Sequence, residues 1–354
     1  MPAAEVDLVI AAHDPRRQLG RAVSSALSSA RVARVIVVCH NTPASGIAER
    51  LGALADDRRV HLEHLDDGIP SPAGPFNRGL EGVRADYFAI MGSDDELAPG
   101  AVDRWIEIGE RTGAEVVLPV LRYAGGRRVP TPPTRPGRAA RLDPVRDRLA
   151  YRTAPLGIMS TGRFGSLRFT AGLATGEDLR FSTELWFSGA KIARVRRGAE
   201  YLIHDDAERV TFAKRTVADD LAAVALLLRD RWALGLGERQ RQSLAVKLWR
   251  LPVFGAVHTR AGAWSVADRR ALRDICAMLD AFAPRARGVL SRADEALVRA
   301  ILDLAATDAE LDARSRARRR FVSPRALLPN RLSAIAAREA PLRFAAATWL
   351  AGRD

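Results

Sequence analysis

Two adjacent carboxylates, Asp94 and Asp95, directly follow an apolar run that ends at Gly92. The run has the composition of a buried strand, so like charges placed directly after it need a physical reason. One interpretation is a helix start, where carboxylates accept hydrogen bonds from free backbone N–H groups and Pro99 fits an early helical position. The other is a site for a hard divalent cation at the carboxyl edge of a sheet. Taken alone, the pair favours the helix start, which is the commoner role of such residues.

Polar side chains also follow the two apolar runs that come earlier in the chain. His13 and Asp14 follow the first run, and His40 and Asn41 end the second. If the three runs form parallel neighbouring strands, all these side chains lie at one edge of the sheet, together with the acidic pair. Loops and helix N-termini at such an edge present unpaired N–H groups to phosphates. The pattern predicts a nucleotide site in which Mg²⁺ or Mn²⁺ holds a diphosphate.

A second acidic pair, Glu177 and Asp178, precedes an apolar helical face later in the chain. A carboxylate in such a position can accept a proton from a hydroxyl group as a general base. It can also cap the helix, and by itself the pair favours capping. His204 follows another apolar run, where the roles of metal ligand and structural histidine are equally open.

Apolar runs and amphipathic segments alternate through the first half of the chain. Short runs rich in β-branched residues predict strands, and apolar residues at helical spacing predict helices. Strands are expected at 6–12, 32–41, 58–65, 86–95 and 114–124, and helices at 16–29, 44–56, 77–85 and 99–112. The alternation predicts an α/β fold with a mostly parallel sheet that is covered by helices on both faces. Residues 125–141, rich in Gly, Pro and Arg, predict a long loop.

Helical patterns predominate from about residue 216 onward. We expect a catalytic domain at 1–215, a helical domain at 216–312 and a tail at 313–354. The tail holds ten arginines and two acidic residues, mixed with apolar and aromatic side chains. This mixture suits contact with anionic lipid at a membrane surface. It also suits a tail that packs on the helical domain with its arginines in solvent.

The composition excludes several classes of protein. Only two cysteines occur in 354 residues, so neither a disulfide framework nor a cysteine zinc cluster is expected. No apolar stretch approaches the roughly 20 residues of a membrane-spanning helix, and the N-terminus does not resemble a signal peptide. We therefore expect a cytoplasmic protein. The net charge of +13 would suit nucleic-acid binding, but acids at the predicted ligand edge and the lack of basic stretches interleaved with aromatics argue against it.

Four segments, in order along residues 5–212, together resemble the family 2 glycosyltransferases, which are inverting enzymes of the GT-A fold. They are VDLVIAAHDPRRQLGRAVSSAL, VIVVCHNT, GIPSPAGPFNRGLEGVRADYFAIMGSDDELAPGAVDRW and TGEDLRFSTELWFSGAKIARV. The resemblance implies a Rossmann-like GT-A sheet followed by an α-helical C-terminal region. It also implies transfer of a sugar from a nucleotide-diphosphate donor to a hydroxyl acceptor, such as a cell-envelope glycan or a lipid-linked saccharide. Docking of the tail at the inner membrane face would bring the site to such an acceptor.

The resemblance also implies roles for individual residues. Asp178 matches the catalytic base of the family, and Glu177 matches its neighbour. Asp94 matches a ligand of Mg²⁺ or Mn²⁺, with Asp95 beside it and His204 near the metal or the diphosphate. The residues that the resemblance places around the nucleotide are Ala12, His13, Asp14, His40, Asn41, Asn77, Arg78, Ser93 and Asp94.

Two positions depart from the pattern of the family. Gly92 stands where the metal motif usually has its first Asp, and His40 and Asn41 stand where an Asp commonly contacts the nucleobase. These departures keep two alternatives open: a catalytically weak scaffold of GT-A fold, and a basic protein that binds polyanions. The retained Asp94 and Asp178 favour an enzyme, because a scaffold has no need of them.

Overall fold

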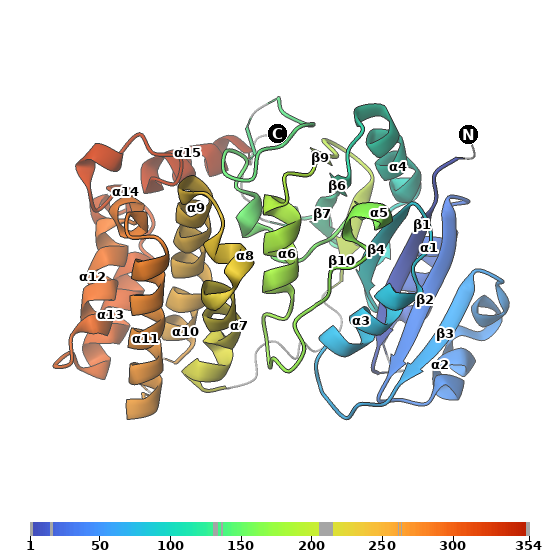
Figure 1. Ribbon diagram of the computed structural model, residues 1–354, viewed down its shortest axis with the longest axis horizontal. Helices are drawn as coiled ribbons and strands as arrows, with labels where there is room; N and C mark the ends of the chain where they lie inside the picture. Colours follow the sequence, from blue (N-terminus) through green and yellow to red (C-terminus); the bar gives the residue numbers. More distant parts are fainter. Residues whose placement is uncertain are drawn as a thin grey trace.

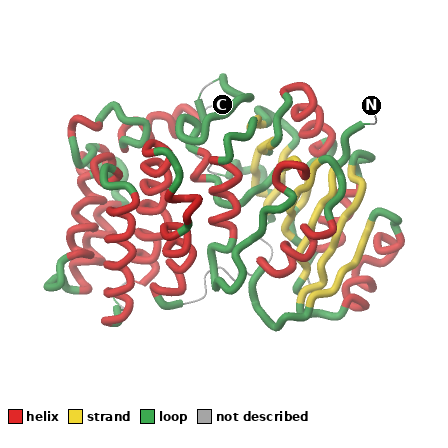
Figure 2. The backbone as a smooth tube through the Cα atoms, in the orientation of Figure 1, coloured by secondary structure: helices red, strands yellow, loops and turns green. Residues whose placement is uncertain are grey.

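The computed structural model describes residues 3–14, 17–129, 134–135, 137–204, 215–260, 262 and 264–351. Its strands gather in one half of the molecule, and a group of packed helices forms the other half (Figures 1 and 2). Within these described ranges, no helix is long and apolar enough to cross a membrane.

A seven-stranded sheet forms the centre of the N-terminal half. Its strands are β1 (Val6–Ala12), β2 (Val32–His40), β3 (Val60–Leu65), β4 (Tyr87–Gly92), β6 (Val116–Leu118), β8 (Ile158–Ser160) and β9 (Ile192–Arg194). The strand order is β3-β2-β1-β4-β8-β6-β9. β1 runs parallel to both of its neighbours, whereas β8 is antiparallel to β4 and β6. The predicted α/β fold with a mostly parallel sheet is therefore confirmed.

Helices cover both faces of this sheet. They are α1 (Leu19–Leu27), α2 (Ala44–Leu51), α3 (Ala73–Gly82), α4 (Ala101–Thr112), α5 (Thr161–Phe164) and α6 (Asp178–Phe187). Side chains alternate along β1, so Leu8 belongs to the apolar cluster of one face and Val9 to that of the other. α3 approaches the sheet closely at Gly79, where a Cβ atom would lie 2.3 Å from Val9 Cγ1. This contact requires a glycine.

The prediction of a single strand at 114–124 is wrong. Two strands take its place: β6 ends before Pro119, and β7 (Val120–Tyr123) follows it. Because proline has no N–H group to continue the ladder, the chain leaves the large sheet at this residue. β7 joins a second sheet of order β5-β10-β7, in which β5 is Glu96–Leu97 and β10 is Glu200–Ile203.

Other predicted elements differ from the structure only at their ends. The helix predicted at 77–85 begins earlier, at Ala73, and the one predicted at 44–56 ends in a 3₁₀ turn, Gly52–Asp56. The described parts of the loop predicted at 125–141 contain neither a helix nor an extended strand.

The regular elements described from Val217 onward are helical. They are α7 (Val217–Arg229), α8 (Arg231–Leu234), α9 (Glu238–Leu248), α10 (Phe254–Arg260), α11 (Val266–Phe282), α12 (Arg292–Leu302), α13 (Asp308–Arg318), α14 (Pro324–Leu327) and α15 (Pro341–Ala351). Pro252 removes a backbone donor between α9 and α10, and the chain forms a π-helical turn there. Leu185 of α6 and Leu244 of α9 belong to one continuous buried cluster. The domain limits at 215 and 312 stay predictions.

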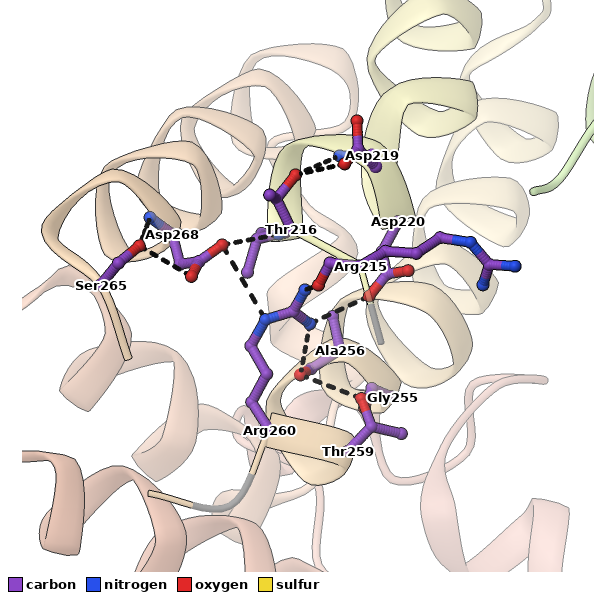
Figure 3. A network of polar contacts seen from close by, with 11 residues as sticks. Arg215, Thr216, Asp219, Asp220, Gly255, Ala256, Thr259, Arg260, Ser265 and Asp268 are labelled. Carbon is purple, nitrogen blue, oxygen red and sulfur yellow. Dashed lines mark hydrogen bonds and ion pairs between the residues drawn. The ribbon is translucent and has the colours of Figure 1, made fainter. Parts of the chain in front are cut away.

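Arg260, at the end of α10, holds the start of α7 (Figure 3). Its Nη1 atom lies 2.9 Å from Asp220 Oδ2 on α7, and its Nε atom lies 3.9 Å from Asp268 Oδ1 on α11. The same guanidinium donates a hydrogen bond to the backbone carbonyl of Arg215. Asp268 also accepts a hydrogen bond from Val217 N at 2.7 Å. One buried cation therefore ties three helices together where α7 begins.

Replacing Arg260 with methionine is expected to lower the free energy of unfolding by about 3 kcal/mol, because two carboxylates would lose their shared cation. Denaturant unfolding of the full chain measures this change. The control is Arg285→Met, which breaks an exposed pair with Glu238 and should cost less than about 1 kcal/mol. Equal losses in the two variants would contradict a special role for Arg260.

Candidate functional site

The carboxyl ends of β1, β2 and β4 lie side by side, because β1 pairs in parallel with both neighbours. Partial burial and the Arg17 guanidinium lower the pKa of His13. Two other groups also act electrostatically on His13: His40 at the end of β2 and Asp94 just after β4. The polar groups predicted to meet at one edge of the sheet are thus close enough to interact.

The two carboxylates that follow β4 point in different directions. Asp95 is turned inward, where Tyr201 Oη donates to its Oδ2 atom at 2.6 Å and His204 N donates to its Oδ1 atom at 3.2 Å. Burial raises the pKa of Asp95. Asp94 stays at the edge, where Arg17 Nη1 lies 3.0 Å from its Oδ2 atom. Asp94 is therefore the carboxylate that can meet a ligand at this edge.

The helix-start interpretation of this acidic pair is wrong. β5 follows directly, and α4 begins only after Gly100, which occupies the N-cap position with a φ of 71°. Pro99 therefore precedes the helix instead of lying in its first turn. The pair has no capping role that would account for its charges.

Asp95 also explains why Gly92 interrupts the acidic motif. A Cβ atom at position 92 would lie 2.5 Å from Asp95 Oδ2. Gly92 N also donates a hydrogen bond to Tyr201 Oη at 3.0 Å. No side chain fits at the first position of the motif while Asp95 makes these contacts.

Of the two carboxylates that follow β4, Asp94 is the one placed to meet a divalent cation. The ring of His204 is engaged elsewhere, because its Nε2 atom lies 3.1 Å from Glu96 Oε2. Among the residues that the structure describes, no group of three or more His, Cys, Asp or Glu could hold a metal ion. Magnesium commonly binds through one or two carboxylates together with substrate phosphates. Within the described ranges, the donor set fits a cation that Asp94 would share with a diphosphate, and it does not fit an ion held by protein side chains alone.

The end of β2 is tied to the loop that follows β3. His40 is buried, and its Nε2 atom lies 2.9 Å from Asp67 Oδ1. Asn41 has a φ of 52°, and its Oδ1 atom accepts from the N–H groups of Asp67 and Gly68 at 3.1 and 2.9 Å. Hydrogen bonds from Ile69 N and from His40 lower the pKa of Asp67. Sequence reasoning missed Asp67, although an acidic residue shortly after a predicted strand is the same signal that identified Asp94.

Asn77 on α3 holds the segment that leads to α6. Its Nδ2 atom donates to Phe169 O at 3.0 Å, and its Oδ1 atom accepts from Phe169 N at 2.7 Å. The rings of Phe76, Phe169 and Phe181 stack in series, with centroids 5.3 and 4.7 Å apart. α3, whose first turn lies close after the β3 loop, therefore fixes the position of α6.

Four other residues predicted to surround the nucleotide lie at strand ends or on α3. Ala12 and Ser93 are buried at the ends of β1 and β4, and Asp14 is partly exposed. Arg78 is half-exposed on α3 and pairs through Nε with Glu63 Oε2 at 2.8 Å. Contact of these residues with a nucleotide stays a prediction, as it does for Asn77.

α6 begins at Asp178, and Glu177 occupies its N-cap position without a side-chain capping hydrogen bond. Burial, and to a lesser extent the charge of Glu177, raises the pKa of Asp178 to about 6. A carboxyl group with this pKa is ionised at neutral pH and accepts a proton more readily than an ordinary aspartate. Asp178 therefore has the properties of a general base.

Lys247, on α9, acts on Asp178 from the helical half of the molecule. It is buried, with 3% of its surface exposed, and burial lowers its pKa to about 8. Its positive charge lowers the pKa of Asp178, and the Asp178 carboxylate raises that of Lys247. Sequence reasoning missed this residue, whose one signal is a lysine inside the apolar stretch LAVKLW.

The N-terminal half is similar to known proteins. Residues 7–169 match the family model of glycosyl transferase family 2. A stretch of 114 residues is 31% identical to the succinoglycan biosynthesis protein ExoO of Rhizobium meliloti (strain 1021). That match covers 32% of this chain and 32% of ExoO, so the similarity spans about a third of this relative.

Solved structures of TarS from S. aureus share the fold over most of the chain. TarS 1-349 in complex with UDP-GlcNAc gives a TM-score of 0.72 at 16% identity, covering 89% of this chain and 91% of that chain. TarS 1-349 in complex with UDP gives 0.69 at 15% identity, covering 91% and 93%. The predicted GT-A fold with a helical C-terminal region is confirmed by this likeness.

Proposed function

We propose that this chain, whose residues 7–169 match the family model of glycosyl transferase family 2, transfers a sugar from a nucleotide-diphosphate donor to a hydroxyl group of an acceptor. The observation that carries the proposal is the half-buried Asp178 at the start of α6, whose pKa is raised to about 6. The aromatic stack that begins on α3 supports its position beside the donor edge of the sheet.

The donor would lie across the carboxyl ends of β1, β2 and β4, where open α/β sheets bind their ligands. Asp94 would hold Mg²⁺ or Mn²⁺ together with oxygens of the diphosphate, and Arg17 lies beside this carboxylate. A bound cation would neutralise negative charge that develops on the departing diphosphate. His40, Asn41 and Asp67 form a polar end to β2 that suits hydrogen bonds to the nucleobase or ribose.

Asp178 would act on the acceptor. Its carboxylate takes the proton of the attacking hydroxyl group, and the hydroxyl oxygen forms a bond to the anomeric carbon of the sugar. The bond between that carbon and the diphosphate oxygen breaks at the same time, so the configuration inverts and a nucleotide diphosphate is released. Glu177 would add negative charge beside Asp178, and this charge helps to hold the pKa of Asp178 above that of an ordinary aspartate.

The acceptor would be a cell-envelope saccharide or a lipid-linked saccharide. The name of ExoO refers to succinoglycan biosynthesis, and TarS binds UDP-GlcNAc in its crystal structure. These similarities make UDP-GlcNAc the first donor to test.

A panel of nucleotide sugars tests the function. The full chain is mixed with each donor in Mn²⁺, Mg²⁺ or EDTA, and donor affinity is measured by calorimetry together with release of the nucleotide diphosphate. We expect at least one donor to bind more tightly with the cation and to be slowly hydrolysed. If no nucleotide sugar binds, the chain is a scaffold of the same fold and the proposal is wrong.

Lys247→Met is expected to move the acid limb of the kcat/KM profile to higher pH. Without the buried positive charge the pKa of Asp178 rises, so a smaller fraction of the base is ionised near pH 6. The loss should shrink above pH 8, where Lys247 itself is largely neutral. The control is the exposed Lys191, whose replacement by methionine should leave the profile unchanged. If the pH profile of Lys247→Met were not shifted, this lysine would have only a packing role.

The C-terminal tail would contact the surface of the inner membrane from the cytoplasmic side. Part of the tail is packed: Glu339 is buried, and the Phe344 ring lies 4.7 Å from the Arg148 guanidinium and 5.3 Å from that of Arg250. Another part is exposed, including Phe321 and Trp349. Exposed apolar side chains among arginines suit an interfacial contact with anionic lipid.

Sedimentation with anionic vesicles tests the tail contact. Truncation of the tail would remove Glu339, the buried partner of Arg148 and Arg250, so point substitutions are preferable. We expect Trp349→Ser combined with Leu350→Ser to reduce the bound fraction several-fold at low salt. The control combines Leu302→Ser with Leu304→Ser, which removes two exposed apolar side chains outside the tail. Equal binding of the two double variants would show that the tail is structural.

A further inference from the structure

A second polar feature lies away from Asp94 and Asp178. A hollow of about 470 Å³ opens between α4 and the residues that follow β9. Five arginines line it, and we call it the arginine hollow: Arg104, Arg111, Arg194, Arg196 and Arg197. A neighbouring hollow shares Arg111 and adds Arg138 and Arg141.

The fold itself gathers these arginines. Arg104, Ile108 and Arg111 recur at helical spacing, so they share one face of α4. On the other side, Arg194 N donates to Ala139 O at 2.8 Å and Arg194 Nε donates to Arg138 O at 2.9 Å. These bonds fix the rim of the hollow against the edge strand of the sheet.

The charges of the hollow are poorly balanced by protein acids. Arg104 pairs with Glu107 at 2.9 Å. Within the described part of the chain, no carboxylate pairs with Arg111, Arg196 or Arg197, and all three are exposed. Several guanidinium groups around one concave surface create a positive potential that concentrates anions, and each can bind phosphate or carboxylate through two parallel hydrogen bonds.

We propose that the arginine hollow binds a non-aromatic anionic polymer, a glycan chain that carries phosphate or carboxylate groups. The lining argues against nucleic acid, because none of its described residues has an aromatic side chain on which a base could stack. It also argues against membrane insertion, because its apolar members Ile108 and Val195 are buried. Repeated charges along a flexible chain match repeated guanidinium groups along the hollow.

The hollow lies within reach of the proposed catalytic edge. Arg197 precedes β10, and His204, whose backbone N–H binds Asp95, follows it. Even a fully extended chain between these two residues would span no more than about 25 Å. A polymer held in the hollow can therefore extend to the edge of the large sheet; that such a polymer is the acceptor rests on the proposed function, whereas binding does not.

Binding to defined polymers tests the inference. The full chain is titrated with fluorescently labelled polygalacturonate, which carries carboxylates, with inorganic polyphosphate, and with uncharged dextran. The variant Arg111→Gln/Arg196→Gln/Arg197→Gln is compared with Arg229→Gln/Arg231→Gln/Arg239→Gln, which removes three exposed arginines from α7, α8 and α9. Thermal unfolding confirms that both are folded, and Arg196→Gln/Arg197→Gln replaces the first variant if it is not.

We expect the hollow variant to bind one or both anionic polymers at least 10-fold more weakly than the wild type, with a smaller dependence of affinity on salt, as for other contacts to polyanions. The control variant should bind within about threefold of the wild type, and dextran should not bind. Equal weakening of polymer binding in both variants would overturn the inference, because it would show nonspecific attraction to positive charge anywhere on the surface. Preferred binding of an oligonucleotide or of phosphatidylglycerol vesicles, lost in the same hollow variant, would overturn it as well. Donor affinity is measured in parallel, so failure of the proposed sugar transfer would leave a positive polymer result intact.

Discussion

Replacement of Asp178 by asparagine is expected to lower the rate of sugar transfer by about 10²–10⁴-fold, the usual contribution of a general base. Asparagine keeps the size of the side chain but cannot accept the proton of the attacking hydroxyl group. Donor affinity should stay unchanged, because the proposed partner of Asp178 is the acceptor and not the diphosphate. The measurements are kcat with a saturating acceptor and calorimetric titration of the donor.

Glu177→Gln is the matched control, since it removes the same charge one residue earlier. It should reduce transfer much less and should move the acid limb of the profile to lower pH, because Glu177 raises the pKa of Asp178. If Asp178→Asn kept near-wild-type turnover, or if Glu177→Gln were the more damaging change, the assignment of the base would be wrong.

The same substitution should change stability with a defined dependence on pH. The pKa of Asp178 is about 6 in the folded protein and near 3.9 in an unfolded chain, so ionisation is disfavoured in the folded state. This cost to stability is complete above pH 6 and absent below about pH 4, where the group is protonated in both states. Asp178→Asn is therefore expected to raise Tm at pH 7.5 and to leave it unchanged near pH 3.5.

The large sheet could be predicted because its central strands are buried on both faces and read as continuous apolar runs. β1 has the predicted limits, Val6 to Ala12. The division at Pro119 could not be predicted from the apolar pattern, which continues across it. What separates β6 from β7 is the choice of partner: Val117 pairs with Ala193, and Leu121 pairs with Tyr201 in another sheet.

Only those parts of the site that are marked by a short stretch of sequence could be predicted. Acidic pairs after a strand and before a helix identified Asp94 and Asp178 as candidates, but local rules could not separate a ligand from a cap. The interactions that bear on this choice come from distant parts of the chain, namely Tyr201 for the acidic turn and Lys247 for Asp178. No pattern in a short stretch of sequence predicts that a tyrosine of β10 contacts the end of β4, or that a lysine of α9 acts on the first residue of α6.

Asp94→Asn is expected to weaken binding of the nucleotide diphosphate in the presence of Mn²⁺ by at least about 100-fold. Substitution of a residue that merely supports a metal ligand typically costs 10–100-fold, and loss of the charged ligand itself should cost no less. Asparagine keeps a hydrogen-bond acceptor for Arg17 Nη1, so the turn should stay folded. Calorimetry with UDP in Mn²⁺ and in EDTA measures the change.

Two further variants distinguish a loss of cation binding from a loss of folding stability. Asp86→Asn makes the same chemical change at the amino end of β4, where Asp86 accepts a hydrogen bond from Glu5 N, and it should leave UDP affinity unaltered. Asp95→Asn should lower Tm more than Asp94→Asn, because Asp95 is the inward residue that joins Tyr201 to the backbone of His204. If Asp94→Asn bound UDP as the wild type does in Mn²⁺, the edge carboxylate would hold no cation. If EDTA left wild-type affinity unchanged, binding would depend on the arginines beside Asp94, and Arg17→Gln would then become the damaging substitution.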